Sequence, residues 1–195
     1  MRVAGLLLAP GAGSDRDHPG LVAIEVAVAP LPVVRHDFPY RLRGGRRPPD
    51  RAPVLVASVV DAASELADRI GAAPEALVLG GRSMGGRMCS MAVAEGLPAA
   101  GLALVGYPLH PPERPDRLRT GHLPAIHVPC LFVSGTRDGF GTPAELEAAT
   151  ASIPGPVTHQ WIEGGRHELK GAEEEVADLV ATWIEELATP AAGRA

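Results

Sequence analysis

The chain has 195 residues, which suits one domain with a sizeable core and leaves little room for two. A hydrophobic fraction of 46% excludes a disordered chain, and no apolar stretch is long enough for a membrane-spanning helix. A net charge of −5 offers no general attraction to nucleic acid or to membrane surfaces. We therefore expect a globular protein that binds neither.

The first third of the chain alternates short apolar runs with helix-length segments. A continuous apolar run predicts a buried strand over residues 3–9, followed by a glycine-rich loop and a helix over 18–29. A second strand is expected over 33–38, and the Pro-, Arg- and Gly-rich residues 39–53 predict a loop. Apolar residues at helical spacing then predict a helix over 54–70.

The remainder continues this alternation. The pattern predicts strands over 76–80, 101–105, 130–134 and 157–162, and helices over 84–95, 143–152 and 172–187. Six strand–helix alternations favour one parallel sheet with helices on both faces. We expect a single domain over residues 1–189 and a disordered tail over 190–195.

One motif carries most of the chemistry, the run Gly80-Gly-Arg-Ser-Met-Gly-Gly-Arg between an expected strand and an expected helix. A serine in Gly-x-Ser-x-Gly at such a turn marks a nucleophile elbow. Only glycine at Gly81 and Gly85 lets the strand and the helix approach closely. The turn lifts the Ser83 hydroxyl clear of the sheet, and the helix N-terminus behind it favours developing negative charge.

Two further candidates follow later strands, where sites in parallel sheets lie. Asp138 follows the fifth strand and His167 the sixth, which gives the order Ser, Asp, His. His167 would accept the proton of Ser83, and Asp138 would hold the imidazole and stabilise its charged form. For an oxyanion hole we expect the backbone N–H of Met84 and that of Ala12 or Gly11.

Each candidate has a competing interpretation. Asp138 precedes a glycine, where an aspartate often serves only to cap a turn. His159 is a second histidine near His167, but it falls inside an expected strand. The other histidines show no metal-ligand spacing and are interpreted as surface or loop residues, so we expect no metal and no cofactor. Cys89 and Cys130 are interpreted as buried, reduced thiols.

Arginines gather near the expected site. Arg46 and Arg47 lie in the loop after the second strand, and Arg82 and Arg87 flank the elbow of the nucleophile candidate. They are either solvated charges or groups that hold a substrate carboxylate or phosphate, to which arginine binds in a bidentate manner.

Several separate motifs, taken in order, resemble one known group. The chain is similar to small α/β-hydrolases of the dienelactone-hydrolase-like superfamily, and within it to the branch that includes testis-expressed protein 30 and its bacterial relatives. The residues that carry this resemblance are Leu8-Ala-Pro-Gly-Ala-Gly-Ser-Asp, His18-Pro, Phe38-Pro-Tyr, Gly45-Arg-Arg-Pro-Pro-Asp, the elbow, Tyr107-Pro-Leu-His, Gly135-Thr-Arg-Asp-Gly-Phe-Gly-Thr-Pro and Gly165-Arg-His.

The resemblance implies a compact α/β-hydrolase fold that lacks the N-terminal strands of the full family. Two departures matter. Pro10-Gly11 stands where many relatives have His-Gly, and Ser83 stands where dienelactone hydrolases proper use cysteine. A lactone-specific activity is therefore not carried over. The roughly two dozen residues between the fourth and fifth strands are too few for a cap domain, so we expect an open, shallow site.

The resulting hypothesis is a serine hydrolase that cleaves a small carboxylic ester or thioester through an acyl-enzyme. Two alternatives remain open: a non-catalytic scaffold that kept the fold for partner binding, and an acyltransferase that uses the same residues. We expect a monomer or homodimer. The apolar N-terminal run is too short for a signal peptide, so we expect a cytoplasmic location, and the arginine-rich composition is typical of GC-rich bacterial genomes.

Overall fold

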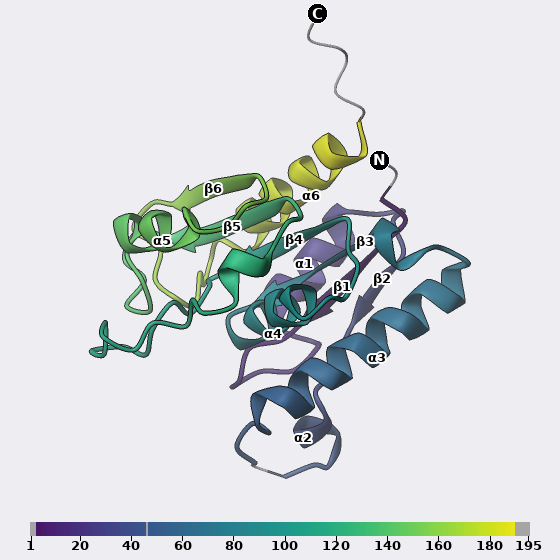
Figure 1. The fold of residues 1–195 in the computed structure, drawn as a ribbon, viewed down its shortest axis with the longest axis horizontal. Coiled ribbons are helices and arrows are strands. Elements are labelled where there is room, and N and C mark those ends of the chain that lie inside the picture. The colour runs from purple at the N-terminus through teal and green to yellow at the C-terminus, as the bar shows by residue number, and fades with distance from the viewer. Residues whose placement is uncertain (1–2, 46, 190–195) are drawn as a thin grey trace, which may run out of the picture.

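The computed structural model describes residues 3–45 and 47–189. Within this part of the chain, six strands form one sheet in the order β2-β1-β3-β4-β5-β6, and every neighbouring pair is parallel (Figure 1). The predicted parallel sheet is thereby confirmed. The strands are β1 (Gly5–Ala9), β2 (Val33–Arg35), β3 (Leu77–Arg82), β4 (Gly101–Val105), β5 (Cys130–Gly135) and β6 (Val157–Ile162).

Helices cover both faces of this sheet (Figure 1). Helices α1 (Pro19–Ala27) and α6 (Glu173–Ala188) pack on one face and contact each other. The opposite face is covered by α3 (Ala52–Ile70), α4 (Met84–Ala94) and α5 (Pro143–Thr150). The four central strands β1, β3, β4 and β5 are buried on both faces and are largely apolar. The edge strands β2 and β6 are only partly buried, and β6 carries the polar residues Thr158, His159 and Gln160.

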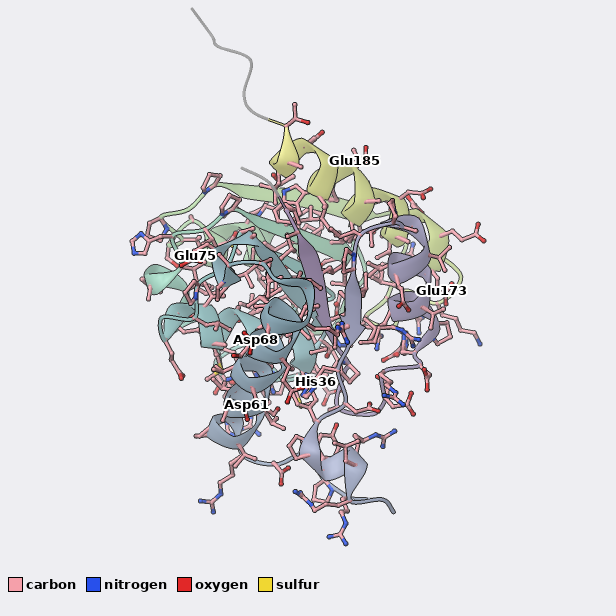
Figure 2. The ribbon with its side chains drawn as sticks, turned by 90° about the vertical axis from the view of Figure 1, so that its right-hand side faces the viewer. His36, Asp61, Asp68, Glu75, Glu173 and Glu185 are labelled. Carbon is pink, nitrogen blue, oxygen red and sulfur yellow. The ribbon has the colours of Figure 1, made fainter. Side chains whose placement is uncertain are left out.

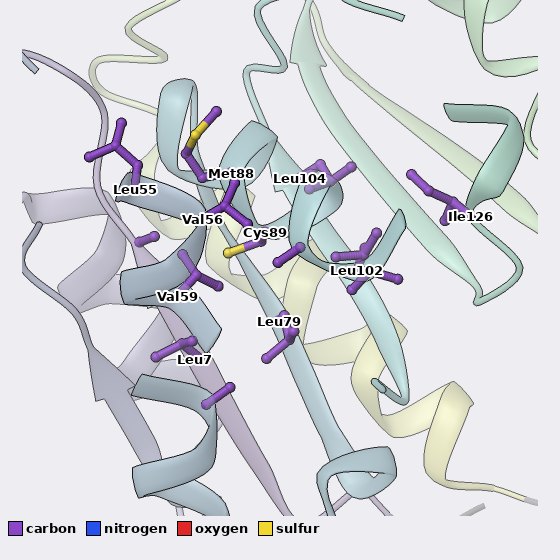
Figure 3. Packing of buried hydrophobic residues seen from close by; sticks show 14 of the residues in the cluster. Leu7, Leu55, Val56, Val59, Leu79, Met88, Cys89, Leu102, Leu104 and Ile126 are labelled. Atoms are coloured by element: carbon purple, nitrogen blue, oxygen red, sulfur yellow. The ribbon is translucent and has the colours of Figure 1, made fainter. Parts of the chain in front are cut away.

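Successive side chains of β1 point to opposite faces of the sheet and so belong alternately to the two hydrophobic cores. Leu6 and Leu8 pack with α1 and α6, whereas Leu7 packs with α3 and α4. Figure 3 shows the second of these cores, with Leu7 and Leu79 of the sheet facing Val59 of α3. Each fully buried leucine contributes about 1.5–3 kcal/mol to folding. The cores hold the strand ends, and hence the loops that follow them, in place.

The predicted loop over residues 39–53 is wrong at both ends. A short helix, α2 (Pro39–Leu42), lies within it, and α3 begins at Ala52, before the expected start at residue 54. Both helices carry proline in the first turn, where a missing N–H costs nothing and the fixed φ favours the helix. Proline therefore begins both helices here, whereas the sequence analysis took the proline-rich residues 39–53 as evidence for a loop.

Most other boundaries differ from the predicted ones by one to three residues, and two of these differences have a clear local reason. The second strand ends at Arg35 and not at residue 38, because β1 offers β2 only the partners Leu6 to Leu8. Helix α1 begins after His18, whose Nδ1 accepts the N–H of Gly20 at 3.1 Å and so caps the helix.

The segment between β4 and β5 is short and irregular. Residues 106–129 contain one 3-10 helix, η2 (Leu123–Ala125), and no cap domain, as predicted. Among the described residues, no helix combines the length and apolar character that crossing a membrane requires. Cys89 and Cys130 are free and buried, as expected, and burial raises the pKa of each thiol to about 12.

Candidate active site

The turn between β3 and α4 has the strained geometry of a nucleophile elbow. Ser83 has φ 50° and ψ −119°, an unfavourable backbone conformation for a residue with a side chain. Its N–H donates to the carbonyl of Val105 on the neighbouring strand at 2.8 Å, which holds the turn against the sheet. The strain is therefore supported by the surrounding structure.

Close packing explains the glycines on either side of Ser83. Gly81 pairs with Ala9 across β1 and β3, and a Cβ on Gly81 would collide with the Ala9 carbonyl oxygen. A Cβ on Gly85 would collide with the same oxygen. The end of β1, the end of β3 and the start of α4 thus meet at a separation that only glycine permits.

A chain of hydrogen bonds links Ser83, His167 and Asp138. Ser83 Oγ lies 2.8 Å from His167 Nε2, and His167 Nδ1 lies 2.8 Å from Asp138 Oδ2. An ionised carboxylate only accepts hydrogen bonds, so Nδ1 carries the ring proton and Nε2 accepts from the serine hydroxyl. The side chain of Asp138 is 1% exposed and that of His167 is 12% exposed, so bulk water scarcely reaches either group.

Further contacts orient the acid and the base. The second carboxylate oxygen of Asp138 accepts the N–H of Phe140 at 2.8 Å. Arg82 donates to the carbonyl oxygen of His167 at 3.1 Å and to the Glu168 carboxylate at 2.8 Å. These bonds fix the two loops that carry Asp138 and His167, so the imidazole has little freedom to leave Ser83.

The glycine-rich loop after β1 lies beside the elbow. Gly11, Ala12 and Met84 line the same cleft as Ser83. The buried side chain of Tyr40 on α2 donates its hydroxyl to the carbonyl oxygen of Ala12 at 2.9 Å. This bond fixes the loop, and the missed helix α2 therefore supports the predicted oxyanion region.

A cleft of about 640 Å³ opens above these residues. Its lining includes Ser83, His167, Phe140 and the three arginines Arg82, Arg87 and Arg119. Cavities that bind small molecules typically have volumes of about 300–1,000 Å³, so the cleft can hold a small substrate.

The structure distributes the predicted arginines differently. Arg46 lies outside the described residues. Arg47 is exposed, donates to the Gly44 carbonyl at 3.1 Å and does not line the cleft. Arg82 does line it. Arg87, which follows Ser83 by one helical turn and was expected with Arg82 to flank the elbow, lines the cleft as well. Arg119 was not predicted as a site residue.

The remaining histidines take no part in the Ser83 hydrogen bonds. His159 lies in β6, bonds to Thr150 at 2.9 Å and does not line the cleft. His110 lies in a loop, as expected, but is buried there. Within residues 3–45 and 47–189, no three His, Cys, Asp or Glu side chains are grouped as metal ligands.

Solved structures with the same arrangement of elements include several hydrolases. A dienelactone hydrolase from Anabaena variabilis has a TM-score of 0.71 and 21% identity, covering 94% of this chain and 87% of its own. An α/β serine hydrolase homologue from Coxiella burnetii has a TM-score of 0.74 and 17% identity, covering 93% and 86%. A structure from work on two metagenome-derived lipolytic enzymes has a TM-score of 0.74 and 17% identity, covering 95% and 94%.

At such identities these neighbours establish the fold. The family model described as "Alpha/beta hydrolase domain" matches residues 2–191, nearly the whole chain. This match supports a hydrolase, while the narrower branch that includes testis-expressed protein 30 stays a prediction. The chain belongs to the α/β-hydrolase domain family, with a fold of the dienelactone-hydrolase-like type.

Proposed function

We propose that this protein is a serine hydrolase that cleaves a small carboxylic ester or thioester through an acyl-enzyme on Ser83. The observation that supports this best is the unbroken line of hydrogen bonds from Ser83 Oγ through His167 to Asp138 at the base of the cleft. A serine hydroxyl becomes a useful nucleophile only when a base accepts its proton. The 2.8 Å contact between Ser83 Oγ and His167 Nε2 supports His167 in that role.

In the proposed first step, Ser83 Oγ attacks the acyl carbonyl carbon while His167 Nε2 takes the hydroxyl proton. The carbonyl oxygen becomes an anion, which the N–H of Met84 and that of Ala12 or Gly11 would bind. Collapse of this intermediate breaks the bond to the leaving group, and His167 returns the proton to the departing alcohol or thiol. Water then repeats the sequence on the acyl-enzyme and releases the acid.

Asp138 acts on the base and not on the substrate. Its carboxylate accepts the Nδ1 proton at 2.8 Å, which leaves Nε2 free to accept the serine proton. Once the imidazolium forms, the nearby negative charge stabilises it. Because the Asp138 side chain is buried, little solvent screens this interaction.

The test is a screen of 4-nitrophenyl esters and acyl thioesters with pure wild type, Ser83→Ala and Ser152→Ala. Ser152 lies at an exposed position after α5 and is a matched control for the loss of a hydroxyl. We expect turnover in wild type and Ser152→Ala and none in Ser83→Ala. Turnover retained by Ser83→Ala would overturn the proposal.

The two alternatives make different predictions in the same screen. A scaffold would give a folded protein that hydrolyses none of the esters. An acyltransferase would consume the ester but deliver the acyl group to an added alcohol or amine and release little free acid. Neither alternative is favoured by an observation of its own, and the cytoplasmic location and the oligomeric state stay predictions.

A further inference from the structure

Two arginines in the cleft have no acidic partner. Glu168 is the only carboxylate among the described residues that line the cleft, and Arg82 binds it. Neither Arg87 nor Arg119 forms an ion pair within the described part of the chain. The cleft therefore carries two uncompensated positive charges beside Ser83.

These two charges act on each other. Burial is the largest cause that lowers the pKa of Arg119, and the positive charge of Arg87 is the second. The Nε of Arg87 is buried and has no hydrogen-bond partner in the described structure. A buried donor without an acceptor is unfavourable, and so are two neighbouring guanidinium groups without a counter-charge. An anion between them would relieve both penalties.

A network of hydrogen bonds links the backbones of the two arginines. Ser90 donates its hydroxyl to the Arg87 carbonyl at 2.8 Å, and Tyr107 donates to the Arg119 carbonyl at 3.0 Å. Because both hydroxyl protons are used, His122 Nε2 must carry a proton that it donates to Ser90 Oγ at 2.8 Å. His122 Nε2 also lies 3.4 Å from the Tyr107 hydroxyl oxygen, so Ser90, His122 and Tyr107 connect the backbone carbonyls of the two arginines.

The positive charge in the cleft contrasts with the net charge of the whole chain. The chain has a net charge of −5. The five carboxylates labelled in Figure 2 belong to α3, to the 3-10 helix η1 (Pro74–Ala76) and to α6, and none of them lines the cleft. The positive pair is a local feature of the cleft.

We propose that Arg87 and Arg119 form a subsite for a carboxylate or phosphate group carried by the substrate. Arginine offers planar, paired donors that match the oxygens of both groups. The inference rests on the proposed function, since it makes the substrate of the Ser83 reaction an anionic ester or thioester. The sequence-based expectation offered Arg46, Arg47, Arg82 and Arg87 for this role; the structure narrows it to Arg87 and adds Arg119.

Binding is tested first in the Ser83→Ala protein, where no hydrolysis interferes. The probes are adipate, for the carboxylate, and inorganic phosphate, each titrated calorimetrically. We expect at least one probe to bind, and Arg87→Gln or Arg119→Gln to weaken it by about tenfold or more, as for a charge-assisted hydrogen bond. The probe that binds more tightly identifies the class of anion.

Arg117→Gln is the matched control, because Arg117 is exposed in the same loop as Arg119 and does not line the cleft. It should leave the affinity unchanged. Equal affinity in the Arg87, Arg119 and Arg117 variants, or no binding of either probe, would overturn the subsite.

Kinetics then separate the two proposals. The substrates are 4-nitrophenyl hydrogen adipate and 4-nitrophenyl hexanoate, which share a leaving group and acyl-chain length but differ in charge. We expect wild type to prefer the anionic ester, and both arginine variants to lose that preference about tenfold, mainly through KM. Turnover without any anionic preference in wild type would overturn the subsite and leave the serine hydrolase standing. Anion binding by Arg87 and Arg119 without any ester turnover would overturn the serine hydrolase and leave the anion subsite standing.

Discussion

The ring of Phe140 stacks on the imidazole of His167, with ring centroids 3.9 Å apart and planes inclined by 26°. The N–H of the same residue donates to the Asp138 carboxylate. One residue of the loop after β5 therefore covers the base and orients the acid. This arrangement explains how a loop without regular secondary structure holds two ionisable side chains in register with Ser83.

Replacing Asp138 by asparagine should lower kcat by about three to four orders of magnitude. An amide can donate to Nδ1, which would shift the imidazole to the tautomer that cannot accept the serine proton. The measurement is ester turnover with wild type, Asp138→Asn and Asp178→Asn, the last being an exposed position on α6. A kcat for Asp138→Asn within tenfold of wild type would contradict the assigned role.

Removing the hydroxyl of Tyr40 should loosen the glycine-rich loop. Tyr40→Phe loses the bond to the Ala12 carbonyl, and we expect kcat to fall about tenfold with KM little changed, since an oxyanion donor acts mainly on the transition state. Steady-state kinetics and a urea unfolding curve on the same sample measure the two effects separately. A lower free energy of unfolding with unchanged kcat would show that Tyr40 supports only the fold.

A methyl group at Gly85 should disrupt the elbow. In Gly85→Ala the new Cβ would collide with the Ala9 carbonyl oxygen, so we expect a loss of about 3 kcal/mol or more in the free energy of unfolding. Gly121→Ala is the control, because a Cβ there meets nothing within 4 Å. Equal stability of the two variants in urea unfolding would show that the backbone at the elbow is not packed as described.

His122 should make the protein less stable in mild acid. Burial and the charge of Arg87 lower its pKa from 6.5 to about 4 in the folded state. As the pH drops, the unfolded chain therefore binds a proton at this histidine before the folded protein does. The contribution of His122 to the free energy of unfolding falls between about pH 6.5 and about pH 4 and changes little below that. Urea unfolding across this range should show a smaller loss for His122→Gln than for wild type or for His127→Gln, which alters an exposed histidine. An identical pH dependence of the free energy of unfolding in all three proteins would show that His122 does not cause the loss of stability in acid.

Much of the fold was predictable because its signals are local. The buried strands are continuous apolar runs, and Gly81 and Gly85 mark the turn at Ser83 on both sides. The same reasoning placed Asp138 and His167 after strands that end at one edge of the sheet. In the structure His167 lies within hydrogen-bonding distance of both Ser83 and Asp138. Their catalytic roles stay a proposal.

The parts that were missed depend on contacts between distant residues. Helix α2 lies in a proline- and arginine-rich stretch, and its value comes from Tyr40 reaching Ala12, 28 positions away in the chain. Arg119 lies in an irregular loop, and its position depends on the buried Tyr107 hydroxyl. The arginine-rich loop made Arg47 a predicted substrate contact, but its side chain is exposed and donates to Gly44 in the same loop. The local pattern identifies Arg87, one helical turn after Ser83, but carries no information about Arg119 in its irregular loop.

The most direct test of the central claim is labelling with a fluorophosphonate probe, followed by intact mass measurement and peptide mapping. An activated serine attacks such a probe and retains it covalently, and activation requires the assembled base. The account predicts a single adduct on Ser83 in wild type and none in Ser83→Ala. A folded wild-type protein that acquires no adduct, or acquires it at another residue, would contradict it.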